Sequence, residues 1–161
     1  MASFDHKYHV VIYSHHATSS HGYPMKHRTR DLAKTDFEQL SEFRYQMRRF
    51  ERFSEQAAQN EGITPLQYLL LLHIKGYPGR EWATIGELAE RLQAQHHGAV
   101  ALVSRCEAIE LVERRVSERD RRQVEVHLLP AGEALLARLA ELHRAELRTL
   151  DGRFTIPQID L

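Results

Sequence analysis

The sequence lacks several features that define common protein classes. No apolar run approaches the ~20 residues that span a bilayer as a helix, so no membrane partner is expected. The block Val10, Val11 and Ile12 is too short for the hydrophobic region of a secretory signal. Cys106 is the single cysteine, which excludes an internal disulfide and fits a reducing compartment. We therefore expect a cytoplasmic protein.

Catalytic motifs are lacking as well. The sequence has no Gly-rich phosphate loop, no nucleophile elbow and no His/carboxylate set with motif spacing, so we expect neither an enzyme nor a cofactor. The 22 basic and 22 acidic residues cancel, which argues against coating nucleic acid through bulk charge. Locally placed arginines remain compatible with DNA binding. A length of 161 residues, with 42% hydrophobic and 27% charged residues, is typical of one globular domain.

Residues 1–34 are interpreted as a flexible, histidine-rich arm. Their histidines are interspersed with Ser, Thr, Gly and Pro, and they number six of the eleven in the chain: His6, His9, His15, His16, His21 and His27. The His6-x-x-His9 spacing suits metal ligands, but zinc prefers a fixed tetrahedral set that includes Cys or carboxylate. No metal site is therefore assigned, and a metal-responsive regulator remains an alternative.

Residues 35–62 are expected to form a long dimerisation helix. Thr35 and Glu38 have the spacing of a capping box, and Gly62 is expected to end the helix. Apolar residues recur every three or four positions between them: Phe37, Leu40, Phe43, Met47, Phe50, Phe53 and Ala57. This stripe exposes too much apolar surface for a lone helix, so it must pack on another helix, for example one from a second subunit.

Residues 63–129 show the spacing of a helix-turn-helix. Thr64 to Gln67 and Thr84 to Glu87 form two further capping boxes, and the helix over 65–75 is apolar nearly all round, which predicts a buried centre. The second of these boxes opens a short helix, and a turn at 93–95 leads from it into a longer helix from His96 to about Ile109. Its inner stripe is expected to comprise Ala99, Leu102, Val103, Cys106 and Ile109.

A β-hairpin is predicted next, from two β-like runs at 112–116 and 123–128. Its tip carries Arg119, Asp120, Arg121 and Arg122, which cannot belong to a core. A hairpin in this place is typical of a winged helix. Residues 130–161 then read as a long C-terminal dimerisation helix, beginning at Pro130 and apolar on two sides, with a short tail.

Several motifs in this order resemble the MarR family of transcriptional regulators: Thr64-Pro65-x-Gln67, Ile85-Gly86-Glu87-Leu88-Ala89, Val103-x-Arg105, Leu111-Val112-x-Arg114, Asp120-Arg121-Arg122 and Leu128-x-Pro130-Ala131-Gly132. The resemblance implies a mainly α fold with a small β-hairpin wing, a winged helix-turn-helix flanked by long dimerisation helices. It also implies a homodimer on a double-stranded DNA operator, in most members a repressor, that is released by a small aromatic or anionic effector.

Three departures from the family pattern stand out. Glu110 replaces the usual glycine, so the helix 96–109 is expected to lose the low-energy left-handed cap that glycine provides. Leu129 replaces the usual threonine, so the last helix loses an N-cap side chain. Only residues 153–161 remain where the family adds another helix, which leaves dimerisation to the first helix, the helix 130–150 and the arm.

The DNA-contacting residues are expected on the outer N-terminal side of the helix that starts near His96, where helix-turn-helix proteins meet base edges. They are Gln95, His96, His97, Gly98, Val100, Ser104 and Arg105. In the wing, Arg122 is expected to enter an A·T minor groove, and Arg119 and Arg121 to contact phosphate or remain solvated. Asp120 is assigned to organising the wing by pairing with a neighbouring arginine. Merely solvated side chains are the alternative at both places.

A ligand pocket under the first helix is expected to be lined by Phe43, Met47, Tyr68, His73 and Trp82, although aromatic stripes more often form core. Cys106 raises the alternative of a redox-responsive regulator, but buried cysteines are inert. A winged helix used only for protein interaction, without DNA binding, is the other alternative, because the net charge is zero.

Overall fold

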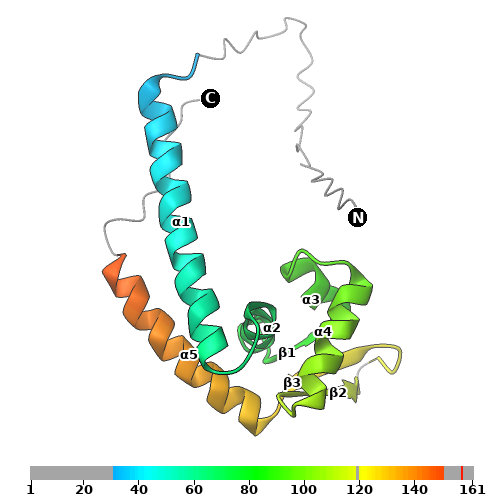
Figure 1. Cartoon of the computed structure of the whole chain (residues 1–161). Helices are drawn as coiled ribbons and strands as arrows, with labels where there is room; N and C mark the ends of the chain where they lie inside the picture. The colour runs from blue at the N-terminus through cyan, green and yellow to red at the C-terminus, as the bar shows by residue number, and fades with distance from the viewer. Residues whose placement is uncertain (1–30, 119, 151–156, 158–161) are drawn as a thin grey trace, which may run out of the picture. The chain divides into compact units, whose positions relative to one another are not determined.

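The computed structural model describes residues 31–118, 120–150 and 157. Within them, helices and one three-stranded antiparallel sheet follow in the order α1 (Lys34–Asn60), α2 (Pro65–Lys75), β1 (Trp82–Thr84), α3 (Ile85–Arg91), α4 (His96–Ala108), β2 (Val112–Val116), β3 (Val124–Leu128) and α5 (Pro130–Thr149) (Figure 1). The predicted fold class is confirmed. No helix in these ranges combines the length and apolarity that crossing a bilayer requires. Residues 1–30 of the predicted arm 1–34, and the tail after Leu150 apart from Pro157, lie outside the described residues.

The long helix α1 begins one residue before the expected boundary and is capped differently. The expected capping box of Thr35 and Glu38 is wrong: Ala33 is the N-cap, and its backbone N–H donates to the Asp36 carboxylate at 2.8 Å. Asp36 stands three residues after the N-cap, the position from which a side chain reaches back. Of the 27 residues of α1 only Gln46, Ala57 and Ala58 are buried. In its N-terminal half, Phe37 and Leu40 of the apolar stripe are exposed.

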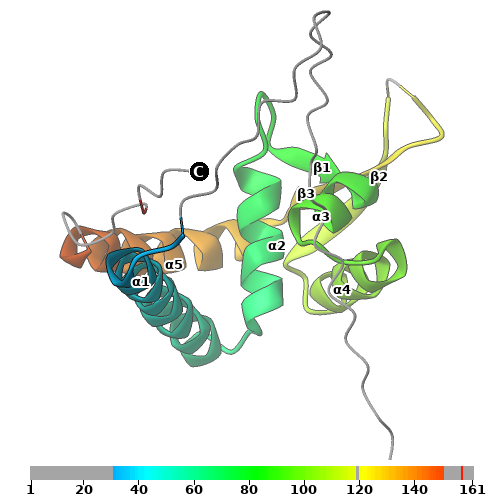
Figure 2. The same ribbon diagram turned by 90° about the horizontal axis from the view of Figure 1, so that it is seen from above.

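Helix α2 is the centre of the fold. In its confirmed capping box, the Thr64 N–H donates to Gln67 Oε1 at 2.8 Å and the Gln67 N–H donates to Thr64 Oγ1 at 3.3 Å. Figure 2 shows α2 between the pair α1 and α5 on one side and α3, α4 and the sheet on the other, and α2 contacts all of them. Leu70, Leu71 and Ile74 are fully buried. Leu66 and Leu72 are exposed, so burial is less complete than the apolar pattern predicts.

Three helices end with the same backbone arrangement. The residue after the C-cap of each of these helices has a left-handed φ: +81° at Gly62, +50° at Gln93 and +57° at Glu110. The next N–H then bonds back to the last turn, from Ile63 to the Ala58 carbonyl, from Ala94 to Ala89 and from Leu111 to Cys106. Glu110 thus forms the left-handed cap in spite of its side chain, although this conformation costs a non-glycine residue about 1–2 kcal/mol.

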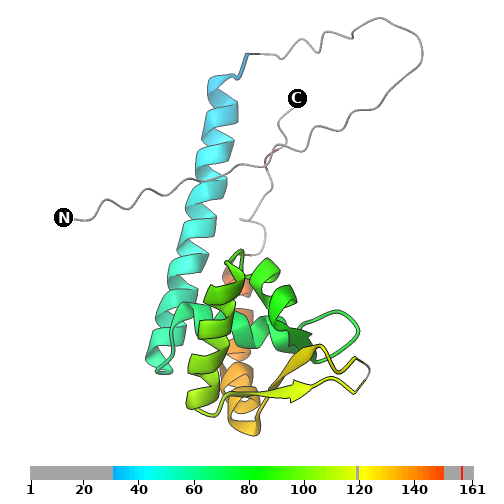
Figure 3. The same ribbon diagram turned by 90° about the vertical axis from the view of Figure 1, so that its right-hand side faces the viewer.

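The sheet has the order β1-β3-β2, with β3 in the middle. Val112 pairs with Leu128 and Val116 with Val124, so the predicted hairpin is confirmed, with Gln123 in the turn. Figure 3 shows the β2–β3 hairpin extending beyond α3 and α4. Because Val112 and Val126 are fully buried, the base of the hairpin is anchored in the core while its tip is not.

Helix α5 packs on the core through Leu135, Leu136 and Leu139, whereas Leu142 and Leu147 are exposed, as expected for a helix that is apolar on two sides. Its N-cap Leu129 makes no side-chain cap, which confirms the consequence of the missing threonine. In α4, the buried stripe is confirmed for all its members except Ile109, which is 49% exposed. Ile109 caps the helix, where the chain turns away from the core.

Candidate nucleic-acid interface and ligand cavity

Helix α3 is fixed to the strand before it by a charged cluster. The Thr84 N–H and hydroxyl donate to Glu87 Oε2 at 2.8 and 2.9 Å, and the Arg80 guanidinium contacts both oxygens of the same carboxylate. Burial alone would raise the pKa of Glu87, but the hydrogen bonds from Arg80 and Thr84 outweigh it and lower the pKa to about 2. The cluster therefore holds an ionised carboxylate at the start of the helix-turn-helix.

Helix α4 presents a polar face opposite its buried stripe. Gln95 is the N-cap and makes no side-chain cap, and Gly98 and Val100 are half-buried. The exposed members of the predicted set are Gln95, His96, His97, Ser104 and Arg105. Helical spacing places His97 and Ser104 on the side away from Cys106. His97 and Ser104 thus share the accessible side of α4, and the role of the predicted residues in DNA binding stays a prediction.

The wing tip is built around the Asp120 carboxylate. Its Oδ1 accepts from the Arg122 backbone N–H at 3.1 Å and from Arg122 Nε at 3.2 Å. These bonds from Arg122 lower the pKa of Asp120. The turn is closed by the Gln123 N–H, which donates to the Asp120 carbonyl at 2.8 Å. Asp120 therefore pairs with Arg122, whose side chain is 92% exposed. Arg121 is also exposed, and Arg119 lies outside the described residues.

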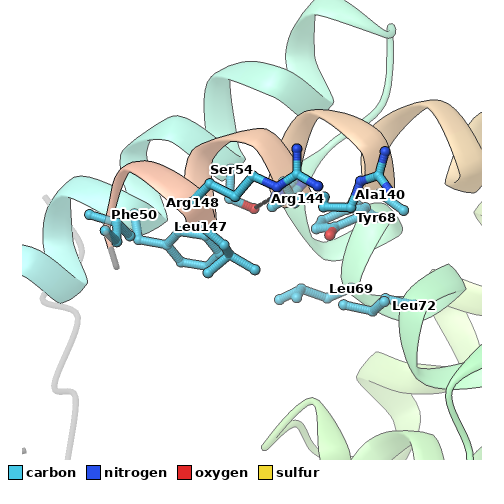
Figure 4. A pocket seen from close by; sticks show the side chains of 11 residues that line it. Phe50, Ser54, Tyr68, Leu69, Leu72, Ala140, Arg144, Leu147 and Arg148 are labelled. Atoms are coloured by element: carbon cyan, nitrogen blue, oxygen red, sulfur yellow. Dashed lines mark hydrogen bonds between the residues drawn. The ribbon is translucent and has the colours of Figure 1, made fainter. Parts of the chain in front are cut away.

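A cavity of about 930 Å³ lies between α1, α2 and α5 (Figure 4). Its lining comes from Phe50, Ser54, Tyr68, Leu69, Leu72, Ala140, His143, Arg144, Leu147, Arg148 and Leu150. Of the five residues predicted to line a pocket, only Tyr68 lines this one. Phe43 and Met47 precede its first lining residue on α1. His73 is half-buried, and burial, together with the nearby charge of Arg91, lowers the pKa of His73. Trp82 stacks on Arg80, with its ring centroid 3.9 Å from the guanidinium carbon.

His143 is the buried polar group of this cavity, and the sequence analysis missed it. Its Nδ1 lies 2.7 Å from the Leu139 carbonyl, which can only accept, so Nδ1 carries the proton. Its Nε2 lies 2.9 Å from Ser54 Oγ, within hydrogen-bond distance. The imidazole stacks on Tyr68 with centroids 4.6 Å apart. The spacing in the sequence could have indicated that His143 is buried, because it follows the buried Leu139 by one helical turn.

Cys106 lies in the core and is 0% exposed. Burial raises the pKa of its thiol to about 11, in spite of a hydrogen bond with Gln67 and the nearby charge of Arg105, which act in the opposite direction. A thiol without a thiolate form is a poor sensor of oxidants. Among the described residues, no group of three His, Cys, Asp or Glu side chains could hold a metal ion.

Comparisons with known proteins point to one family. A sequence model of the MarR family matches residues 61–123. The Bacillus subtilis protein YsmB, an uncharacterized HTH-type transcriptional regulator, is 32% identical over 103 residues, which are 60% of this chain. That match spans 64% of YsmB, so the chain covers slightly less than two thirds of this curated relative.

Solved structures agree in fold. AbsC, a MarR family transcriptional regulator from Streptomyces coelicolor, superposes with a TM-score of 0.65 at 23% identity, over 81% of this chain and 87% of AbsC. A mutant of MepR from Staphylococcus aureus bound to an oligodeoxyribonucleotide superposes with a TM-score of 0.58 at 20% identity, over 77% of this chain and 84% of MepR. At these identities the likeness shows a shared winged-helix fold.

Proposed function

The chain belongs to the MarR family of transcriptional regulators, and from this premise we propose that it is a sequence-specific DNA-binding repressor that acts as a homodimer. One observation carries the proposal. The polar face of α4 and the arginine-bearing wing tip are both accessible, and the core holds the elements that bear them in one unit. A helix followed by a flanking hairpin suits a major groove and the adjacent minor groove.

The homodimer is proposed from apolar side chains that the single chain leaves uncovered on its long helices. Phe37 and Tyr45 on α1 are 54% and 57% exposed, and Leu142 and Leu147 on α5 are 45% and 54% exposed. Several large apolar side chains exposed on the same two long helices favour a protein interface there. A Leu147→Glu protein is expected to sediment as a monomer, whereas the control Leu66→Glu, at an exposed leucine of α2, keeps the dimer. A monomeric wild type would contradict this part of the proposal.

Effector release is proposed from the cavity between α1, α2 and α5. Its walls are mainly apolar, and Arg144 and Arg148 lie among its lining residues. Arg144 also pairs with Glu141 at 2.7 Å on an exposed part of α5. Aromatic carboxylates suit apolar walls beside guanidinium groups. They should release DNA, whereas the corresponding neutral amides should not, and Arg148→Ala should weaken the effect. Release by amides and carboxylates alike would exclude recognition of the anion.

The DNA-binding proposal is tested by selecting duplexes from a random library with the full chain. One enriched site is expected, with two half-sites related by the symmetry of the dimer. Placing it in a promoter should lower reporter expression if the protein represses. Enrichment of no sequence would favour the alternative of a protein-interaction module, for which the zero net charge is the supporting observation.

The wing is tested on the selected duplex with Arg121→Ala and Arg122→Ala. Loss of a phosphate contact should reduce the salt slope by about 0.9, and loss of a base contact should mainly relax sequence preference. Arg138→Ala is the matched control, because Arg138 is an equally charged, exposed side chain that pairs with Glu61, the C-cap residue of α1, away from the wing. If both wing variants bind as tightly as wild type, the wing takes no part in binding.

A further inference from the structure

Arg114 of β2 joins the wing to helix α4. Its backbone N–H donates to Glu107 Oε1 at 3.1 Å, and its Nη1 forms an ion pair with the other oxygen of that carboxylate. Its Nη2 donates to the Val100 carbonyl at 3.1 Å and to Ser104 Oγ at 2.9 Å. One guanidinium thus contacts α4 at three positions spread over two helical turns. The Arg114 and Glu107 side chains are 26% and 37% exposed, so their ion pair is partly shielded from solvent, whereas the bond to Ser104 is exposed.

This link sets the hydrogen-bonding state of Ser104. The Ser104 hydroxyl donates its proton to the Val100 carbonyl at 3.1 Å and accepts from Arg114 Nη2. A serine hydroxyl has one proton and two lone pairs. Because the proton and one lone pair are engaged, Ser104 can offer DNA one remaining lone pair and acts as an acceptor. A free serine would both donate and accept, and would therefore discriminate less between base edges.

Only an arginine can make all three contacts. Glu107 follows Ser104 by three residues, so these two partners of Arg114 lie on adjacent turns of the same helix face. The planar guanidinium fork can point one nitrogen at the carboxylate and another at the serine and the carbonyl. A lysine ammonium is a single point and cannot reach both sets. The link therefore fixes the rotation of α4 relative to β2, the strand that leads to the wing tip.

We propose that Arg114 is a positioning residue for sequence discrimination, which presents α4 to DNA with Ser104 locked as an acceptor. The inference rests on the proposed DNA-binding function and adds to it a residue that would act through Ser104. The positioning role of Arg114 differs from a phosphate contact in what its loss changes. Losing a phosphate contact weakens binding to every sequence and lowers the salt slope, whereas losing the positioning relaxes the choice of bases.

Arg115 offers a matched control. It is the next residue of β2, so its side chain leaves the opposite face of the sheet. Its Nε donates to Glu113 Oε1 at 2.8 Å, and its side chain is 56% exposed. The same substitutions at Arg115 therefore change an equally charged side chain on the same strand without touching the link to α4.

The experiment measures two quantities for the full chain on duplexes selected by the wild type. One is the ratio of Kd for random DNA to Kd for the selected site, and the other is the salt slope. Arg114→Lys and Arg114→Ala should each lower the ratio about tenfold, on the scale of one lost base-specific contact, with the slope unchanged. Arg115→Lys and Arg115→Ala should keep the wild-type ratio. Thermal melting identifies a variant that does not fold, and if Arg114→Ala is one, Arg114→Lys decides.

A double-mutant cycle separates positioning through Ser104 from a general structural effect. Ser104→Ala should lower the ratio as Arg114→Lys does, and the double variant should lose no more than either single variant. Additive losses, an unchanged ratio in Arg114→Lys, or a slope reduced by about 0.9 with the ratio kept would each overturn the inference. If the wild type selects no sequence, the proposed function fails and the inference with it. If the wild type selects a site and Arg114→Lys reads it equally well, only the inference fails.

Discussion

Gly132 in the first turn of α5 lies against the backbone of Leu111, so closely that a Cβ on Gly132 would come within 2.1 Å of the Leu111 carbonyl oxygen. The same carbonyl accepts from the Leu129 N–H at 3.0 Å. The start of α5 is therefore held to the end of the helix-turn-helix by backbone contact. This approach positions α5 and leaves no room for a side chain.

The first prediction concerns this contact. Gly132→Ala should destabilise the protein by about 3 kcal/mol, because the atom that the new methyl meets is backbone and cannot rotate away. Urea unfolding followed by circular dichroism measures the change. Gly86→Ala is the control, since nothing lies within 4 Å of a Cβ built there. Equal stability of the two variants would show that α5 moves away from Leu111 without cost.

The second prediction concerns the left-handed residue after α4. Glu110→Gly should stabilise the protein by about 0.5–1 kcal/mol, because glycine avoids the steric cost at φ +57° but gains freedom in the unfolded chain. Glu110→Ala is the control, because it removes the same carboxylate and keeps the Cβ. The difference between the two variants in urea unfolding isolates the backbone contribution. A glycine variant no more stable than the alanine variant would refute it.

Local sequence patterns predicted the elements whose signals lie within a few residues. The capping boxes that begin at Thr64 and Thr84 were correct because both partners stand on the same turn. At Thr35 the same logic failed, because the helix begins at Lys34, so that Ala33 is the N-cap and Asp36 is the residue three positions on that bonds to it. The bounds of β2 were predicted correctly and those of β3 to within one residue, because polar tip residues separate two short β-like runs.

The cavity could not be predicted because it depends on contacts between distant parts of the chain. Ser54 and His143 meet across 89 positions of sequence, and no local pattern marks either one as a partner of the other. The predicted lining residues were four aromatic side chains and one methionine, of the right chemical type, on α1, α2 and β1. The way these elements cross decides which side chains face a common cavity. Of the five predicted residues, only Tyr68 faces it.

The third prediction concerns pH. The pKa of Glu87 is about 2 in the folded protein, below the value of 4.5 for an unperturbed glutamate. The ionised form therefore stabilises the fold above about pH 4.5, and this contribution is lost as pH falls toward 2. Glu87→Gln should lower stability at pH 7 by about 1–3 kcal/mol, because the Arg80 guanidinium loses its charged partner.

The measurement for Glu87 is the pH dependence of the free energy of unfolding. The loss of stability of the wild type between about pH 4.5 and 2 should be reduced in Glu87→Gln, because the variant has no proton to bind at that site. Glu90→Gln is the control, being an exposed residue on the same helix α3. Identical slopes for wild type and Glu87→Gln over this range would mean that the ion pair with Arg80 contributes nothing.

The fourth prediction concerns Cys106. With a pKa of about 11, the thiolate makes up roughly one part in ten thousand at pH 7. Reaction with a disulfide reagent requires both that thiolate and access, and the native side chain is 0% exposed. Native protein should therefore react only as fast as it opens, whereas protein in guanidinium chloride should react at the rate of a free thiol. Hydrogen peroxide should leave the affinity for the selected duplex unchanged. A loss of DNA binding after peroxide in the wild type, but not in Cys106→Ser, would show that α4 opens often enough for Cys106 to sense oxidants.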